Sequence, residues 1–420
     1  MIKANIPTRK SWIEVSTDSD FPIQNIPFGS LKKSDNIAFV GSRIGNYVIN
    51  LNALQKLNYF CNIPLNEEIF LGNLNAFLKL EKNIWRKVRD RIADIFDVNN
   101  PMKKEHIEMV LSPIKDTKMC MPVDIGDYTD FYSSKQHAYN VGCMFRDPNN
   151  ALLPNWLHMP VGYHGRASSI ILSGESIYRP MGQQLLMNSN KPIFGASKLL
   201  DFELEMGFIT GQGKKIGNRI LTNEADNYIF GMCIFNDWSA RDIQKWEYVP
   251  LGPFLGKSFA SSISPWIVTL DALEPFRVSG EKKEQEILPY LECNEPKNID
   301  IKLEVQIASE RFDPHTISRS NYKNMYWNMA QQLAHHTVNG CNINAGDLMA
   351  SGTISGSNPN SYGSMLELSW KGTKPLKMPD GSVRKFLEDQ DTIIMKAHCK
   401  NQEYRIGFGE VRSKILPPKK

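Results

Sequence analysis

The sequence lacks long apolar runs, paired cysteine motifs and a strong charge of either sign. No run reaches the roughly 18 apolar residues that a membrane helix needs, and residues 1–5 lack the apolar core of a signal peptide. Its 49 basic and 45 acidic residues give a net charge of only +4, which argues against nucleic acid as a partner. Seven cysteines without a Cys-x-x-Cys pair argue against a disulfide framework or a zinc site. We therefore expect a cytoplasmic protein with reduced thiols that binds neither membranes nor nucleic acid.

What remains is an ordinary globular composition, with 41% hydrophobic residues in a chain of 420. This length is typical of two or three domains. Apolar residues recur at helical spacing in residues 83–96, within a first region of mixed character. From about residue 111 onward, short β-rich runs alternate with Gly- and Pro-rich turns, at residues 170–172, 228–235, 266–270, 301–306 and 392–397. We predict a mainly β (α+β) protein with an accessory domain over residues 1–122 and a larger domain of mixed sheets over residues 123–420.

The stretch Asp201-Phe202-Glu203-Leu204-Glu205 alternates three carboxylates with two apolar residues. In a strand, alternate side chains share one face, so the three carboxylates would form a row of like charge. Such a row is unfavourable unless water reaches all three groups or a cation lies among them. A solvated strand face and a cation site are the two alternatives.

Two further aspartates are candidates for the same site. Asp130 lies in a segment rich in Tyr, Ser and Gln, and Asp237 ends the apolar run 230–236. Together with the alternating strand they would form an all-oxygen site, which suits Ca²⁺ or Mg²⁺ better than zinc or copper. The alternative for Asp237 is an N-cap, because an Asp before Ser-Ala-Arg is typical of a helix start.

His137 follows Asp130 by seven residues. A single His is often structural, but beside a hard cation it is better suited to act as a base than as a ligand. Glu367, in an apolar stretch that resembles a strand, is a candidate to fix its tautomer. Arg241, Gln244 and Lys257 follow Asp237 and are donors for an oxyanion. Tyr132, Arg146 and Tyr163 are candidates for holding the far end of an acidic substrate.

Three other motifs receive simpler interpretations. Residues 351–357 (Ser-Gly-Thr-Ile-Ser-Gly-Ser) offer backbone N–H groups for an anionic group, without the ending of a phosphate loop. The glycine-rich stretch 211–217 is interpreted as a hairpin turn after the carboxylate strand. His335 and His336 lie in a helical pattern at residues 326–336 without acidic partners at metalloprotease spacing, and are interpreted as structural.

Four strings in the chain resemble the fumarylacetoacetate hydrolase family: residues 127–132, 153–166, 236–244 and 351–356. The resemblance extends from Asp18 to Gly409. It implies a small N-terminal SH3-like barrel, a C-terminal mixed β-roll that carries the catalytic site, and a homodimer. It also implies that Asp130, Glu203, Glu205 and Asp237 bind Ca²⁺, so that Asp201 is not a ligand. A second ion, Mg²⁺, is associated in the family with Asp237 and the segment at Lys257 and Ser261, where this chain has Ala260 in place of the usual Gly.

The resemblance further implies hydrolysis of the C–C bond of fumarylacetoacetate, a diketo acid, to fumarate and acetoacetate, the last step of tyrosine and phenylalanine catabolism. His137, held by Glu367, would deprotonate the attacking water. Arg241, Gln244 and Lys257 would stabilise the oxyanion. The family's substrate-contacting positions correspond here to Tyr132, Arg146, Tyr163, Arg241, Gln244, Tyr248 and Thr353.

Two alternatives remain open at this point. In the first, the chain has the same fold but acts on another keto acid, as an acylpyruvate hydrolase, a decarboxylase or an isomerase. In the second, the carboxylates bind Ca²⁺ only to stabilise a β scaffold.

Overall fold

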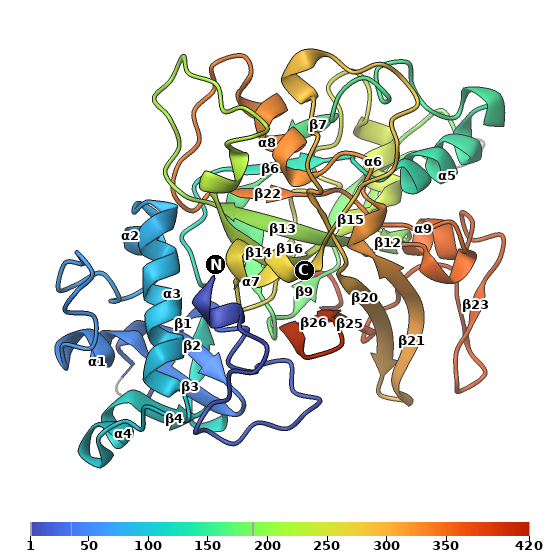
Figure 1. The fold of residues 1–420 in the computed structure, drawn as a ribbon. Coiled ribbons are helices and arrows are strands. Elements are labelled where there is room, and N and C mark those ends of the chain that lie inside the picture. Colours follow the sequence, from blue (N-terminus) through green and yellow to red (C-terminus); the bar gives the residue numbers. More distant parts are fainter. Residues whose placement is uncertain (1, 35, 187–188, 420) are drawn as a thin grey trace.

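The computed structural model describes residues 2–34, 36–186 and 189–419. Strands contain 30% of the residues and helices 23%, which confirms the prediction of a mainly β protein. A smaller N-terminal part lies beside a larger part built from two main sheets (Figure 1). Within the described ranges, no helix has the length and apolar character required to cross a bilayer.

The N-terminal part contains a five-stranded antiparallel sheet with the strand order β4-β3-β2-β1-β5. These strands are β1 (Phe28–Lys32), β2 (Ala38–Ile44), β3 (Tyr47–Asn50), β4 (Leu111–Pro113) and β5 (Lys118–Cys120). The α-helices described in this part are α1 (Leu51–Lys56), α2 (Asn75–Leu78), α3 (Lys82–Phe96) and α4 (Lys104–Val110). Helix α3 confirms the helix that the apolar spacing of residues 83–96 predicted. Its buried side chains, among them Trp85, Val88 and Ile92, all lie on one stripe.

The sheet that carries the site has the order β7-β6-β22-β13-β14-β16-β8, with β17 also paired to β14. Its strands are β6 (Tyr128–Phe131), β7 (Gly162–His164), β8 (Ile170–Leu172), β13 (Leu204–Thr210), β14 (Ile229–Asp237), β16 (Ser261–Ile263), β17 (Val268–Thr269) and β22 (Leu348–Ala350). The pairs β22–β6 and β16–β8 are parallel, and the other pairs are antiparallel.

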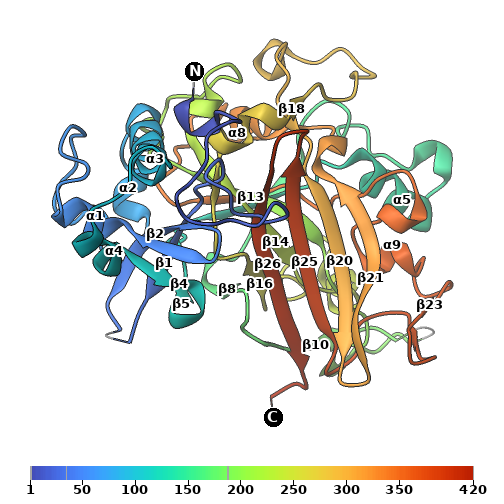
Figure 2. The same cartoon turned by 60° about the horizontal axis from the view of Figure 1, so that its bottom comes forward.

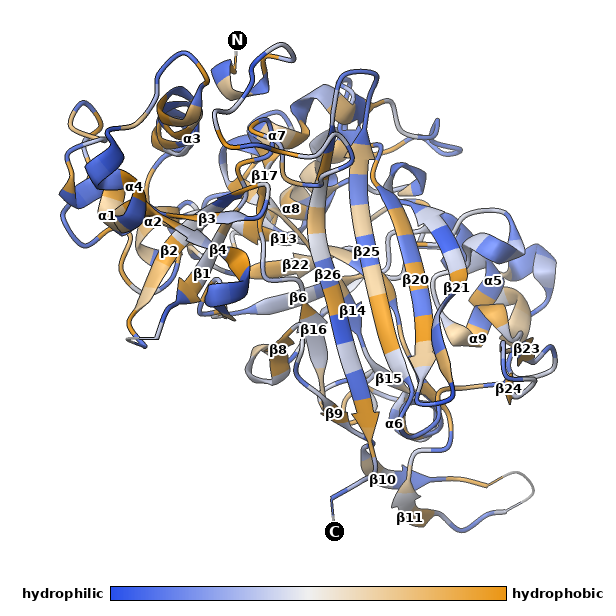
Figure 3. Cartoon of the chain, turned by 90° about the horizontal axis from the view of Figure 1, so that it is seen from below, coloured by the Kyte–Doolittle hydropathy of each residue, from blue (hydrophilic) through white to orange (hydrophobic). Residues whose placement is uncertain are grey.

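A second sheet has the order β21-β20-β25-β26-β9, and Figure 2 shows its long strands side by side. They are β9 (Ile177–Tyr178), β20 (Lys302–Ser309), β21 (Phe312–Asn321), β25 (Thr392–Lys400) and β26 (Arg405–Leu416). Buried residues alternate with more exposed ones over residues 396–400 of β25 and 410–415 of β26, as expected for strands with one face against a core. Figure 3 shows both hydrophobic and hydrophilic residues along these strands. Met206 and Met232 of the first sheet join Val305 and Met395 of the second in one hydrophobic cluster.

Shorter elements connect these sheets. Four two-stranded pairs are β10 (Met181–Gln184) with β11 (Ile193–Ala196), β12 (Leu200–Asp201) with β15 (Ser239–Ala240), β18 (Arg277–Val278) with β19 (Asn298–Ile299), and β23 (Leu376–Lys377) with β24 (Val383–Arg384). The helices of this part are α5 (Lys135–Phe145), α6 (Arg241–Glu247), α7 (Leu270–Leu273), α8 (Met329–Thr337) and α9 (Met365–Leu368). The glycine-rich stretch 211–217 opens the connection between the antiparallel strands β13 and β14, which extends to residue 228.

Strand β14 is buried on both faces, which explains its nearly continuous apolar sequence. Met232 and Ile234 face the cluster between the two main sheets, whereas Phe230 and Phe235 belong to a second cluster that includes the N-terminal part. The ring of Phe230 packs against those of Phe28, Phe77 and Trp85 at centroid distances of 5.2–5.9 Å. The two parts of the chain therefore share a core, while their division at residue 122 stays a prediction.

We expect Phe230→Ala to lower the free energy of unfolding by about 3–5 kcal/mol, because it removes a buried ring that joins both parts. Denaturant unfolding followed by tryptophan fluorescence measures this loss. Ile216→Ala is the control: Ile216 is 79% exposed, so its change should stay within about 0.5 kcal/mol. Equal effects of the two variants would contradict a shared core.

Candidate active site

Three carboxylates meet because their strands are neighbours in the first sheet. Asp130 is the next-to-last residue of β6 and pairs with Ala350 of β22. Glu205 lies near the start of β13, and Asp237 ends β14. Asp130 and Asp237 each lie two residues along their strands from a residue of the cluster on the N-terminal side of the sheet, Tyr128 and Phe235. Glu205 lies four residues from Ile209 of the same cluster, so all three carboxylates share that face. One oxygen from each carboxylate lies within 4.8 Å of the others, and all three residues are buried.

This group has the properties of a cation site. Asp130 Oδ1 and Glu205 Oε1 are buried and have no hydrogen-bond partner among the residues that the structure describes. Burial and the neighbouring negative charges raise the pKa of Asp130 and of Glu205 well above the usual range, and burial also raises the pKa of Asp237. A hard divalent cation coordinated by oxygen would satisfy these atoms and offset their repulsion. The residues present therefore fit the predicted metal, and the solvated strand face is wrong for this stretch.

Glu203 lies beside this group and is bonded to two cations. Its Oε1 accepts from Arg241 Nη2 at 2.7 Å, and its Oε2 accepts from Lys257 Nζ, which also donates to Asp237 Oδ2 at 2.6 Å. Burial alone would raise the pKa of Glu203, but Arg241 and Lys257 lower it below its usual range. The role of Glu203 as a fourth ligand stays a prediction, because both of its oxygens are engaged by side-chain cations.

The predicted continuous strand over residues 201–205 is wrong. It is interrupted at Phe202 and Glu203, and Glu203 forms only an isolated bridge to Ser364. Asp201 belongs to β12 and does not join the row. Its Oδ2 accepts from Arg241 Nε at 2.9 Å, and its oxygens also accept from two backbone N–H groups at the start of α9.

His137 and Glu367 form a buried pair on two helices. Ser134 caps α5, and three residues later His137 Nδ1 lies 2.7 Å from Glu367 Oε2. Burial would raise the pKa of Glu367, but the His137 ring and the surrounding donors lower it. Glu367 lies in the short helix α9 and not in the strand-like stretch that the sequence suggested.

The imidazole also lies close to the carboxylates and to a predicted substrate residue. His137 is close enough to Glu203 to help lower the pKa of that carboxyl, and its ring packs edge-on against that of Tyr132 at a centroid distance of 5.3 Å. The structure therefore brings together the predicted base, its Glu367 partner and the carboxylate site. Asn140, Ser355 and Ser364 were not predicted, although each donates to Glu367 at 2.8–2.9 Å. Asn140 was detectable, since it follows His137 by three residues on a helix.

The predicted oxyanion donors lie at the start of α6 and in the following loop. Arg241 is the first residue of α6, and its Nη1 donates to Gln244 Oε1 at 3.4 Å. The N-cap of this helix is Ala240, so the N-cap alternative for Asp237 is wrong. The carboxylates around Lys257 raise its pKa above the usual value despite burial, which keeps its ammonium group charged.

The predicted substrate residues do not all meet. Tyr132 and Tyr163 lie at the site, with Tyr163 OH donating to Asp237 Oδ2 at 3.5 Å, and Thr353 is buried in the segment that follows β22. Arg146 is exposed at the end of α5 and donates to its local Ala151 carbonyl. Tyr248 is 54% exposed on the loop after α6.

In the 351–357 segment, the backbone N–H of Gly352 contacts a carboxylate of the site itself. Gly352 N donates to Glu205 Oε2 at 2.9 Å. Its φ of +78° favours glycine, and an added Cβ would lie 2.2 Å from the Phe131 carbonyl oxygen.

The segment of the predicted second ion also lies against Asp237, whose Oδ1 accepts from Ser261 Oγ at 2.8 Å. Ala260 packs in the main hydrophobic cluster without a left-handed backbone, so the expected strain from its Cβ does not arise. Lys257 would reach an ion only through its carbonyl, because its ammonium has no lone pair. His335 and His336 bond to Tyr290 and Thr129, in keeping with their structural interpretation.

Comparison with known proteins assigns the family. Residues 24–122 match the family described as Fumarylacetoacetase N-terminal, and residues 128–416 match Fumarylacetoacetate (FAA) hydrolase C-terminal. The chain belongs to the fumarylacetoacetate hydrolase family.

Relatives within this family are similar over nearly the whole chain. The chain is 50% identical to fumarylacetoacetase of Homo sapiens over 97% of its length and 99% of the relative's. It is 48% identical to fumarylacetoacetase of Arabidopsis thaliana over 97% of its length and 98% of the relative's. A fumarylacetoacetate hydrolase structure from Exiguobacterium antarcticum, at 15% identity and a TM-score of 0.53, covers 93% of this chain with 99% of its own length and supports the fold.

The raised carboxyl pKa values predict an unusual pH dependence of stability. A carboxyl with a higher pKa in the folded state takes up protons on folding, so its contribution to stability falls as the pH rises between its unfolded and folded pKa values. We expect chelator-treated protein to lose more stability than its Glu205→Gln variant does when the pH is raised from about 5 to about 8. Added Ca²⁺ should remove most of this difference. Thermal unfolding at several pH values measures this difference. Equal pH slopes for the two proteins would show that the Glu205 carboxyl does not cause the pH dependence.

Proposed function

We propose that the chain is a metal-dependent hydrolase that cleaves the C–C bond of fumarylacetoacetate to give fumarate and acetoacetate. The observation that carries this proposal is a buried His–Glu pair beside three converging carboxylates, in a chain about 50% identical to named fumarylacetoacetases. The reaction would complete tyrosine and phenylalanine breakdown. An accessory domain at residues 1–122 and a catalytic domain at residues 123–420 belong to the same proposal.

The metal would be held by Asp130, Glu205 and Asp237, with Glu203 as the fourth predicted ligand. Ca²⁺ is proposed for this site and Mg²⁺ for a second site at Asp237, Lys257 and Ser261. When bound, a hard divalent cation supplies positive charge that polarises the diketone oxygens of the substrate.

His137 is proposed as the general base. Its Nδ1–H donates to Glu367, which leaves Nε2 as the acceptor of the neutral ring. Nε2 takes a proton from a water whose oxygen bonds to the carbonyl carbon next to the fumaryl group. The bond from this carbon to the acetoacetate part then breaks, and its electron pair stays on the acetoacetate carbon. His137 returns the proton to that carbon, so fumarate and acetoacetate are released and the base is regenerated.

The cationic side chains stabilise charge that develops during this step. Arg241 and Lys257 lie next to Glu203, where a negatively charged oxygen of the substrate would lie near two positive groups. Gln244 adds an amide donor beside Arg241. Tyr132, Tyr163 and Thr353 are proposed to contact the substrate near His137, and Arg146 and Tyr248 to contact it from exposed segments.

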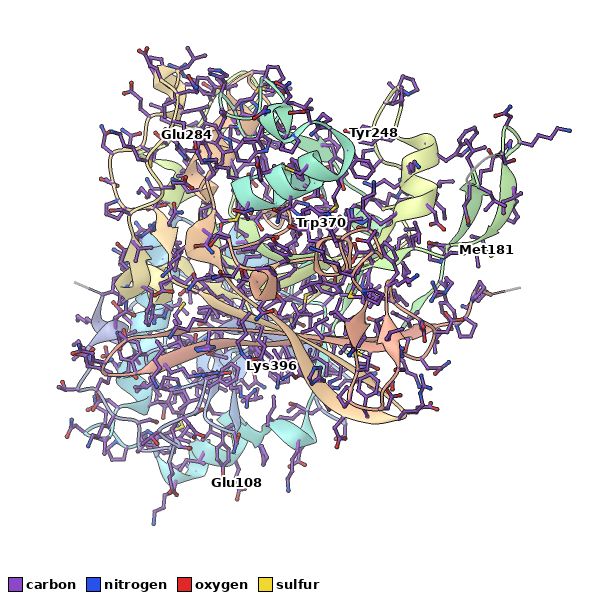
Figure 4. All side chains as sticks on the ribbon, turned by 90° about the vertical axis from the view of Figure 1, so that its right-hand side faces the viewer. Glu108, Met181, Tyr248, Glu284, Trp370 and Lys396 are labelled. Atoms are coloured by element: carbon purple, nitrogen blue, oxygen red, sulfur yellow. The ribbon has the colours of Figure 1, made fainter. Side chains whose placement is uncertain are left out.

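Homodimer formation is supported by an apolar surface. It consists of β10–β11 and the loop after α6, with Phe194 72% and Leu251 97% exposed. Trp246 Nε1 of α6, the helix before this loop, donates to Gln183 Oε1 of β10 at 3.1 Å, which holds the helix against β10. Tyr248 and Met181 lie toward the same side in Figure 4. A second copy of the chain is the proposed partner. Cytoplasmic residence is in keeping with seven free cysteines.

Purified protein mixed with fumarylacetoacetate should consume the diketone absorbance, and a chelator should stop this decay until Ca²⁺ or Mg²⁺ is restored. Acylpyruvates tested side by side should react more slowly. A strong preference for acylpyruvates would favour the related keto-acid enzyme, and metal-dependent stability without turnover of any keto acid would favour the scaffold alternative.

His137→Asn should lower kcat by about 100- to 10,000-fold, because it removes the base. Calorimetry should find Ca²⁺ binding unchanged, since His137 is not one of the three converging ligands. His335→Asn, which changes a histidine bonded to Tyr290, should keep wild-type turnover. Loss of Ca²⁺ affinity in His137→Asn would instead identify the histidine as a ligand.

Leu251→Lys combined with Phe194→Lys should convert a dimer to a monomer in sedimentation velocity, because the two charges would be buried in the apolar contact. Ile216→Lys, at an apolar position of comparable exposure outside this surface, should leave the dimer intact. A double variant that sediments like the wild type would place the contact elsewhere.

A further inference from the structure

Asp201 is the carboxylate of the alternating stretch that is not a predicted metal ligand. It is nevertheless fully buried, and its two oxygens accept three hydrogen bonds. We propose that Asp201 is a positioning residue that fixes Arg241 and the helix carrying Glu367 relative to each other. This inference rests on the proposed function, in which Arg241 stabilises the oxyanion and Glu367 holds the base.

One side of Asp201 determines where the Arg241 guanidinium lies. Arg241 Nε donates to Asp201 Oδ2 at 2.9 Å, while Nη2 donates to Glu203 and Nη1 to Gln244. Because the guanidinium is planar, fixing Nε at Asp201 determines the direction of its other donors. Asp201 therefore orients the group that faces the substrate without itself contacting it.

The other side of Asp201 holds the start of α9. Asp201 Oδ1 accepts from Met365 N at 2.6 Å, and Oδ2 accepts from Leu366 N at 3.1 Å. Helix α9 has only four residues, so it depends on contacts outside itself for its position. Glu367 follows directly after these two N–H groups and bonds to His137 Nδ1. A shift of the helix start would therefore move the carboxylate that orients the base.

Asparagine at position 201 keeps the shape but replaces one acceptor oxygen by a donor. The three donors around Asp201 would then face one oxygen and one NH₂ group, and the Arg241 ion pair would be lost. Substitution of a residue that orients the functional side chains of a site typically lowers activity by about 10- to 100-fold.

Asp391 provides a matched control. It is as deeply buried, its two oxygens accept from Arg384 at 2.9 Å, and Oδ2 also accepts from the backbone N of Glu388. Asp391→Asn therefore removes the same kind of Arg–carboxylate pair and backbone contact without touching Arg241 or α9.

The test compares Asp201→Asn and Asp391→Asn in the full-length protein by kinetics and by proton NMR of the His137–Glu367 hydrogen bond. We expect Asp201→Asn to lower kcat by about 10- to 100-fold and to shift or remove the downfield proton resonance that Glu367→Gln also removes. Asp391→Asn should preserve both. In a Glu367→Gln background, Asp201→Asn should cost much less, because part of its effect acts through Glu367.

An Asp201→Asn protein with wild-type kcat and an unshifted resonance would overturn the proposal, as would equal losses in both backgrounds. If Asp201→Asn does not fold, Asp201→Glu keeps the charge but displaces the carboxylate, and the same shift and loss are expected. Inactivity of the wild type on fumarylacetoacetate would refute the proposed function alone, since the resonance still reports whether Asp201 positions Glu367.

Discussion

The repulsion among three buried carboxylates is the constraint on which the site depends. Asp130, Glu205 and Asp237 come together because β6, β22, β13 and β14 are neighbours in the sheet. Gly207 of β13 and Ala350 of β22 pair with each other, and neither has a large side chain. Lys257 contributes one positive charge to Asp237, while one oxygen each of Asp130 and Glu205 has no hydrogen-bond partner in the described part of the chain. A divalent cation coordinated by these oxygens offsets the remaining negative charge.

The fold buries the three carboxylates, and burial strengthens the repulsion among them. Strand β14 is covered on one face by the second main sheet and on the other by the N-terminal part, and Asp237 stands at its end. Charges in such surroundings interact more strongly than in water, so each ion pair near the site also determines geometry. The His137–Glu367 pair is held separately, by two helices whose starts are fixed by Ser134 and Ser364. Asp201 connects this pair to Arg241.

Much of this arrangement could be predicted from the sequence where the local pattern and the packing agree. The apolar stripe of α3 and the long run of β14 were both recognisable, and the carboxylates of residues 203–205 stood out by their spacing. The interruption at Phe202 and Glu203 was not predictable, because the ion pairs of Glu203 with Arg241 and Lys257 join residues 38 and 54 positions away. The helix at Glu367 was also missed, since α9 is held by Asp201 from a distant strand and its own sequence is apolar. Tertiary contacts outweigh local propensity at both places.

Anomalous diffraction from crystals soaked with Mn²⁺, a divalent ion that also takes oxygen ligands, is the most direct test of the central claim. The account predicts a strong anomalous peak bounded by the carboxylate oxygens of Asp130, Glu205 and Asp237, and its loss in crystals of Glu205→Gln. A map with no peak among these three residues, or with an equal peak after that substitution, would contradict it.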